Sequence, residues 1–98
     1  MKEFIINGNK FGTSKSFYKY VEEIFTSDLS WETGKNLDAF NELLEGGFGQ
    51  HDEGEIITVK WINMASSREK LSSKLYDSII EILEESENVI FEKVNNKN

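Results

Sequence analysis

Three short runs of β-branched and aromatic residues, separated by two long segments of helical periodicity, restrict the folds open to this chain. The runs lie at residues 4–6, 55–62 and 89–91. Between them, apolar residues recur three and four positions apart, as on one face of a helix. Helical connections make consecutive strands run parallel, with right-handed crossovers. We therefore predict an α/β fold, a three-stranded parallel sheet packed with about four helices in the order β-α-α-β-α-α-β.

Each predicted helix begins at a Ser, Thr or Asn that can accept a hydrogen bond from the first turn. The first helix carries the apolar stripe from Phe17 to Phe25, and the second runs from Asn36 to a terminating Gly46. A short helix is expected around residues 68–71, and a longer one carries the stripe from Leu75 to Leu83. The expected caps are Thr13 or Ser14, Asn36, Ser66 or Ser67, and Ser72 or Ser73.

The composition indicates one small domain in a reducing compartment. A chain of 98 residues suits one core, and we expect a domain at residues 1–94 followed by a frayed tail at 95–98. There is no cysteine, which excludes disulfides and thiolate metal sites. No apolar run approaches the length of a signal peptide core or a membrane span. We expect a cytoplasmic protein, monomeric when free and without a cofactor.

The distribution of charge indicates a basic partner. The net charge is −7, which argues against nucleic acid as a ligand. Two intervals, Asn36–Val59 and Leu75–Glu92, contain no Lys or Arg and carry six acids each. Mixed signs serve solubility, whereas blocks of one sign create a directional field. In the second helix, Asp38, Glu42 and Glu45 share one side despite their mutual repulsion.

The residues of known catalytic sites are largely missing. The glycines do not form a phosphate loop, and the acids lack the spacing of a calcium loop. His51, the only histidine, is interpreted as a solvated loop residue. Asp38 and Glu42 could act as an acid–base pair, but two carboxylates on one helix face do not flank a substrate cleft. A small carboxylate enzyme is therefore the least favoured hypothesis, and no metal site is predicted.

The segment from Gly34 to Gly46, Gly-Lys-Asn-Leu-Asp-Ala-Phe-Asn-Glu-Leu-Leu-Glu-Gly, resembles the second helix and preceding loop of the barstar family. These proteins are intracellular inhibitors of barnase-type ribonucleases. The Gly-Gly-Phe-Gly loop at 46–49 is similar to a barstar-like subgroup. Ile5–Gly8, Val59–Trp61 and 66–71 resemble the first strand and turn, second strand and third helix of the family.

The resemblance implies where a ribonuclease would bind. In the family, the loop and second helix cover the nuclease active site. Asp38 matches an acid that faces basic groups of the enzyme, and Glu42 matches the principal acid that mimics the substrate phosphate. An acid of the fourth helix also contributes, and its register here is open. The implied contact residues are Trp31, Glu32, Gly34, Asn36, Asp38, Asn41, Glu42, Glu45, Gly46, Gly47, Phe48, and Glu81, Glu84 or Glu85.

Several of these positions depart from the family pattern. Glu42 replaces an aspartate, and Asn41 and Gly47 replace aromatics. Glu32 replaces a contact tyrosine, with Trp31 beside it as an alternative, and Phe48 is either a core anchor or an exposed contact. These departures indicate a different target nuclease. They also leave open a second hypothesis, a barstar-fold interaction module with an immunity or antitoxin role toward a non-nuclease partner.

Overall fold

The computed structural model describes residues 1–27 and 34–94. Three parallel strands form one sheet in the spatial order β1-β2-β3. This arrangement confirms the predicted α/β fold and its order of elements. The elements are β1 (Lys2–Asn7), the 3₁₀ turn η1 (Gly8–Lys10), α1 (Ser14–Phe25), α2 (Leu37–Glu45), β2 (Ile57–Ile62), α3 (Met64–Lys70), α4 (Ser73–Glu85) and β3 (Val89–Lys93).

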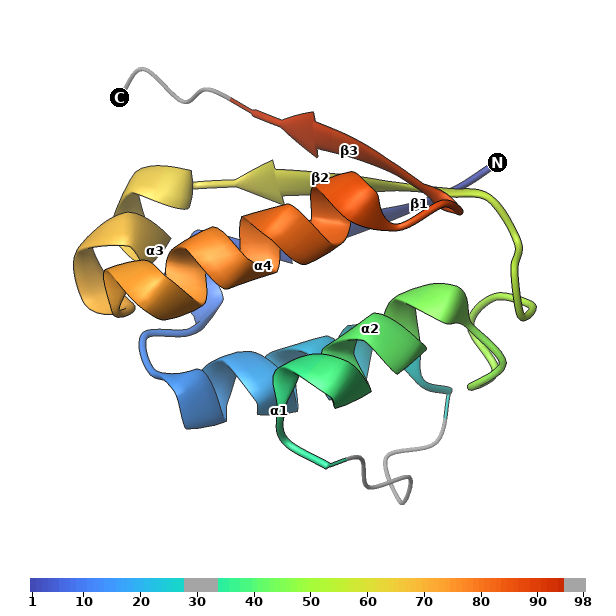
Figure 1. The fold of residues 1–98 in the computed structure, drawn as a ribbon, viewed down its shortest axis with the longest axis horizontal. Coiled ribbons are helices and arrows are strands. Elements are labelled where there is room, and N and C mark those ends of the chain that lie inside the picture. The colour runs from blue at the N-terminus through green and yellow to red at the C-terminus, as the bar shows by residue number, and fades with distance from the viewer. Residues whose placement is uncertain (28–33, 95–98) are drawn as a thin grey trace.

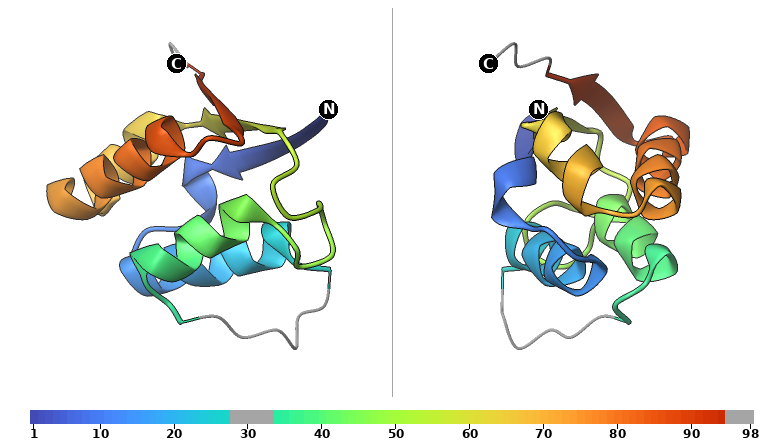
Figure 2. Two further views of the ribbon diagram at one scale, coloured as in Figure 1. Left: turned by 45° about the vertical axis from the view of Figure 1, so that its right-hand side comes forward. Right: turned by 90° about the vertical axis from the view of Figure 1, so that its left-hand side faces the viewer.

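The helices lie on one side of the sheet (Figures 1 and 2). Two right-handed crossovers in the same direction place both pairs of helices on the same face. The strands alternate accordingly, so that Ile6 points to the helices and is buried, whereas Ile5 is 47% exposed. On the opposite face Lys60 pairs with Glu3 at 3.1 Å, and this contact, reinforced by Glu92, raises the pKa of Lys60. The outer face is therefore open and mixed in charge.

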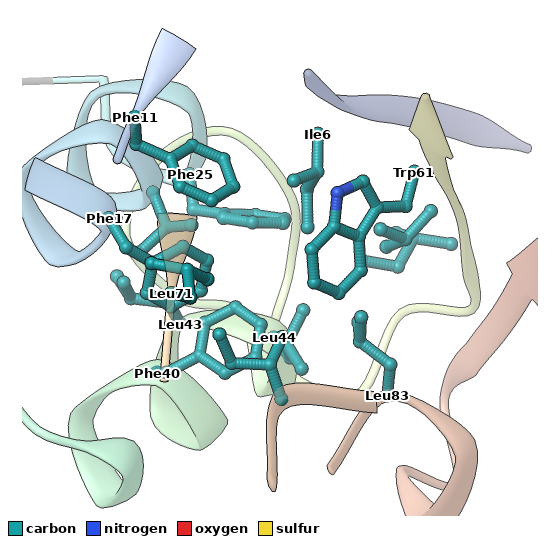
Figure 3. Close-up of a cluster of buried hydrophobic side chains, with 14 residues drawn as sticks. Ile6, Phe11, Phe17, Phe25, Phe40, Leu43, Leu44, Trp61, Leu71 and Leu83 are labelled. Atoms are coloured by element: carbon teal, nitrogen blue, oxygen red, sulfur yellow. The ribbon is translucent and has the colours of Figure 1, made fainter. Parts of the chain in front are cut away.

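The core fills the space between the sheet and the helices (Figure 3). Trp61 of the central strand is fully buried, and its indole N–H donates to Ser67 Oγ at 3.3 Å. Phe17 of α1 meets Phe40 of α2 edge to face, with ring centroids 5.2 Å apart. Such aromatic contacts add to the hydrophobic gain. The predicted core positions of Phe40 and Trp61 are thus confirmed.

The structure corrects some predicted boundaries. Strand β2 begins at Ile57 rather than at residue 55, because its partners begin at Lys2 and Val89. Helix α3 begins at Met64, well before the predicted serine caps. Asn63 causes this early start by adopting a left-handed backbone (φ 55°), which turns the chain directly from β2 into the helix.

Two adjacent isoleucines of β1 test the one-sided core. Ile6→Ala is expected to lower the free energy of unfolding by about 2–5 kcal/mol, because it leaves a cavity. Ile5→Ala also replaces a residue that favours strands, but it leaves no cavity. It should therefore lower the free energy of unfolding by about 1 kcal/mol or less. Urea unfolding of both variants checks the difference, and equal losses would contradict an open outer face.

Candidate functional site

Helix α2 begins and ends as the sequence predicts. The Asn36 side chain accepts a hydrogen bond from the Ala39 amide at 2.8 Å, which satisfies one free donor of the first turn. At the other end Gly46 adopts φ 100°, and its amide donates to the Glu42 carbonyl at 3.2 Å. A residue with a side chain rarely adopts such a φ, so the glycine ends the helix. Both predicted caps are confirmed.

The two sides of α2 differ sharply in character. One side is buried in the core through Ala39, Phe40, Leu43 and Leu44. The other side presents three exposed carboxylates, which we call the acidic face: Asp38, Glu42 and Glu45.

The charges of the acidic face have no counter-ions within the chain as described. The ion pairs found in residues 1–27 and 34–94 involve other acids. Lys35, the basic residue just before α2, pairs instead with Glu22 of α1. Exposed acids at this spacing repel one another, which costs about 0.2–0.5 kcal/mol per pair. Asp38 gains from the helix dipole in the first turn, but no described cation neutralises the face as a whole.

A hollow of about 550 Å³ continues the acidic face towards the end of α4. Asn41 and Glu45 of α2 line one side of it, and the Asn41 amide donates to Glu45 at 3.4 Å. The opposite side carries more acids and one exposed apolar residue. The remaining lining residues are Glu53, Gly54, Ile56, Glu85, Ser86, Glu87 and Asn88.

The hollow distinguishes the three candidate acids of α4. Glu85 lines it together with Asn41 and Glu45. Glu84 instead pairs with Lys93 of β3 at 3.3 Å, so it faces the far side of α4. Glu81 is exposed one turn before Glu85 and does not line the hollow. The structure thus brings Glu85, and not Glu84, beside the residues of α2.

The remaining predicted contact residues lie at the two ends of α2. Gly34 is exposed before the helix, and Trp31 and Glu32 fall outside the described residues. After the helix Gly47 is exposed, whereas Phe48 is half-buried and packs against the core. The carbonyl of Phe48 accepts a hydrogen bond from Ser27 at 3.0 Å. Phe48 therefore packs against the core while the residue as a whole stays partly exposed.

The prediction of a solvated His51 is wrong. Its side chain is 3% exposed and packs against the rings of Phe4 and Phe25. Its Nε2 lies 3.0 Å from the Leu44 carbonyl at the end of α2. Sequence reasoning also missed Asn88, whose amide donates to the same carbonyl at 2.8 Å. Asn88 lies 44 residues after Leu44, so no local pattern signals its contact. His51 lies only seven residues after Leu44, but its polar, glycine-rich surroundings gave no sign that the ring folds back onto the helix.

The geometry favours recognition of a basic surface over chemistry on a small substrate. Asp38 and Glu42 project from one exposed helix face, and neither lines a described pocket. No group of three His, Cys, Asp or Glu side chains within 1–27 and 34–94 is arranged to hold a metal ion. Across the same two ranges, no helix is long and apolar enough to cross a membrane.

The fold and the exposed acids together describe a small α/β domain with an acidic recognition surface. A protein-family model described as Barstar (barnase inhibitor) matches residues 1–96. The chain therefore belongs to the barstar family, whose members are inhibitors and not enzymes. A search of curated proteins gave no match.

Two adjacent glycines test the packing behind the end of α2. A Cβ at Gly46 would lie 2.5 Å from the Asp52 carbonyl and 2.7 Å from the His51 ring, whereas one at Gly47 would only touch Glu53 at 3.8 Å. Both residues have positive φ, so an alanine is strained at either position. Gly46→Ala should therefore destabilise the protein by about 1–3 kcal/mol more than Gly47→Ala. Thermal unfolding of the two variants measures this, and equal midpoints would refute the close contact with His51.

Proposed function

We propose that this protein inhibits a basic ribonuclease of the barnase type by placing α2 and residues 46–48 over the nuclease active site. Family membership supports an inhibitor. The observation that carries the proposal is the acidic face, where Asp38, Glu42 and Glu45 are exposed and unpaired within the described residues. A domain selected only for stability and solubility would mix cations into such a face.

The inhibition would work by occlusion and charge mimicry. Ribonucleases bind phosphate with cationic side chains, and a carboxylate presents a similar pair of anionic oxygens. Glu42 lies in the middle of the acidic face, where the surface of a partner would exclude most water. Its carboxylate can accept two parallel hydrogen bonds from an arginine, and the pairing strengthens as water leaves. Asp38 and Glu45 would face further cations on either side.

The hollow extends this contact beyond α2. Its Glu85 and Glu87 stand opposite Glu45, and Ile56 beside them is 55% exposed. This combination suits a long basic side chain, whose aliphatic stem packs on apolar surface while its head meets the carboxylates. We therefore assign the contribution of α4 to Glu85. Glu84 is already paired with Lys93.

Calorimetric titration into a barnase-type ribonuclease, with an RNA-cleavage assay on the same samples, tests the proposal. One-to-one binding with matching loss of cleavage is the expected result. Binding without loss of cleavage would contradict occlusion of the active site. Absence of binding to a panel of basic ribonucleases would overturn the proposal and favour an interaction module with a non-nuclease partner.

Glu42→Gln removes one charge with almost no change in shape and tests the centre of the face. We expect the dissociation constant to rise about 30-fold or more, which is the effect of losing a hot-spot residue at the interface centre. Glu69→Gln is the matched control, because Glu69 is an exposed acid of α3 away from α2. Surface plasmon resonance compares the two. Equal effects of both substitutions would place the interface elsewhere.

The association rate constant should depend strongly on salt. Long-range attraction between the acidic face and a basic nuclease accelerates encounter, and added ions screen it. Between about 20 mM and 500 mM salt, we expect the association rate constant to fall at least about tenfold while the dissociation rate constant changes less. Stopped-flow mixing measures both. A salt-independent association rate would contradict electrostatic steering.

A further inference from the structure

We propose that Asn88 and His51 are positioning residues that hold two acidic segments of the inhibitor in one fixed arrangement. The segments are the acidic face of α2 and the end of α4 with the turn that follows it. This inference rests on the proposed function, because it assigns a role in partner binding to residues that would not themselves pair with the nuclease.

The loop after α2 and the turn after α4 together supply hydrogen bonds to the last carbonyls of α2. The Leu44 carbonyl accepts hydrogen bonds from His51 Nε2 at 3.0 Å and from Asn88 Nδ2 at 2.8 Å. The next carbonyl, that of Glu45, accepts from the Gly54 amide at 2.7 Å. The last carbonyls of a helix have no partner within the helix. Here they bind residues from 7 to 44 positions further along the chain.

Asn88 connects three segments at this point. Besides the Leu44 carbonyl, its side-chain amide also donates to the Glu55 carbonyl at 3.0 Å. Its own backbone carbonyl accepts from the Ile57 amide at 2.9 Å, where β2 begins. Asn88 therefore joins the end of α2, the start of β2 and the turn before β3. These three segments lie toward the right of Figure 1.

This connection sets the width of the acidic hollow. Asn88 lines the hollow itself, with Glu45 on one side and Glu85 and Glu87 on the other. If the amide bonds were lost, the end of α2 could move relative to α4 and change the separation of these carboxylates. Paired recognition of a cation needs oxygens at defined positions, so binding would lose pre-organisation.

His51 contacts the same Leu44 carbonyl from the core. A carbonyl oxygen only accepts, so Nε2 is the protonated nitrogen of the ring. Its Nδ1 is buried and has no hydrogen-bond partner within the described residues. Burying an unpaired nitrogen costs free energy that an apolar residue would avoid. Since the ring uses one nitrogen only, we infer that this single bond to Leu44 is the reason for a histidine here.

Asn88→Ala and the control Asn63→Ala test the proposal. Asn63 has a left-handed backbone that alanine adopts less readily, so the control loses stability as well as a hydrogen bond. Asn63 also bridges two segments by a side-chain amide, donating to Asn7 at 2.8 Å, but it follows the opposite end of β2. We expect Asn88→Ala to dissociate from the ribonuclease about tenfold faster than Asn63→Ala, since two hydrogen bonds to carbonyls are lost. Asn88→Asp should behave like Asn88→Ala, although it adds a negative charge. Tighter binding by Asn88→Asp would overturn the proposal in favour of charge alone.

A double-mutant cycle separates positioning from general stability. If Asn88 acts by placing Glu45, the effect of Asn88→Ala on affinity should shrink in a Glu45→Gln background and persist in a Glu69→Gln background. Equal effects in both backgrounds would overturn the proposal.

Two variants of His51 test its part in the arrangement. His51→Gln keeps a donor near Leu44 and should bind the ribonuclease more tightly than His51→Leu, which lacks one. Equal affinity of these two variants would show that His51 is not a positioning residue.

Hydrogen exchange distinguishes failure of this inference from failure of the proposed function. The amides of Gly46 and Gly54 should exchange faster in Asn88→Ala than in Asn63→Ala, with or without a nuclease. Faster exchange in a protein that binds no ribonuclease would reject the inhibitor role but keep the inference that Asn88 holds the end of α2 in place. Unchanged exchange would reject that inference itself.

Discussion

The burial of one side of α2 is the constraint on which the rest of the structure depends. A helix of nine residues is too short to be stable alone in water. Phe40, Leu43 and Leu44 hold it through the core, where Phe40 meets Phe17 of α1. Because tertiary packing carries the helix, its exposed side need not contribute to stability. That freedom allows three like charges to stand together and to serve recognition.

The outer face of the sheet and the surface around α2 differ in how their charges are paired. On the outer face of the sheet, Lys60 lies with Glu3 and Glu92, so opposite charges compensate one another. Around α2 the pattern is reversed, since Lys35 turns to Glu22 and leaves the acidic face without a cation among the described residues. Net charge alone could not reveal this division. It depends on which acids already have partners, as the contrast between Glu84 and Glu85 illustrates.

Local sequence patterns predicted those parts of the fold that depend on local physics. Asn36 and Gly46 bound α2 because capping and positive φ are properties of single residues in their immediate neighbourhood. The order of elements followed from periodicity and from the handedness of crossovers. Asn88 escaped prediction because its contact to Leu44 joins segments that are 44 residues apart in the chain. His51 is only seven residues from Leu44, but its burial depends on Phe4 and Phe25 of β1 and α1, which are distant in the sequence. A single histidine within a polar loop sequence does not indicate that its ring will be buried in the core.

The central claim is that α2 and its continuation into the hollow form the surface that meets a ribonuclease. The most direct measurement is backbone NMR of the labelled protein during titration with a barnase-type ribonuclease, with cleavage of RNA followed in parallel. The account predicts saturation at one equivalent, loss of cleavage, and chemical-shift changes concentrated at residues 36–48 and 85–88. Changes centred instead on the outer face of the sheet, around Ile5 and Ile90, would contradict it.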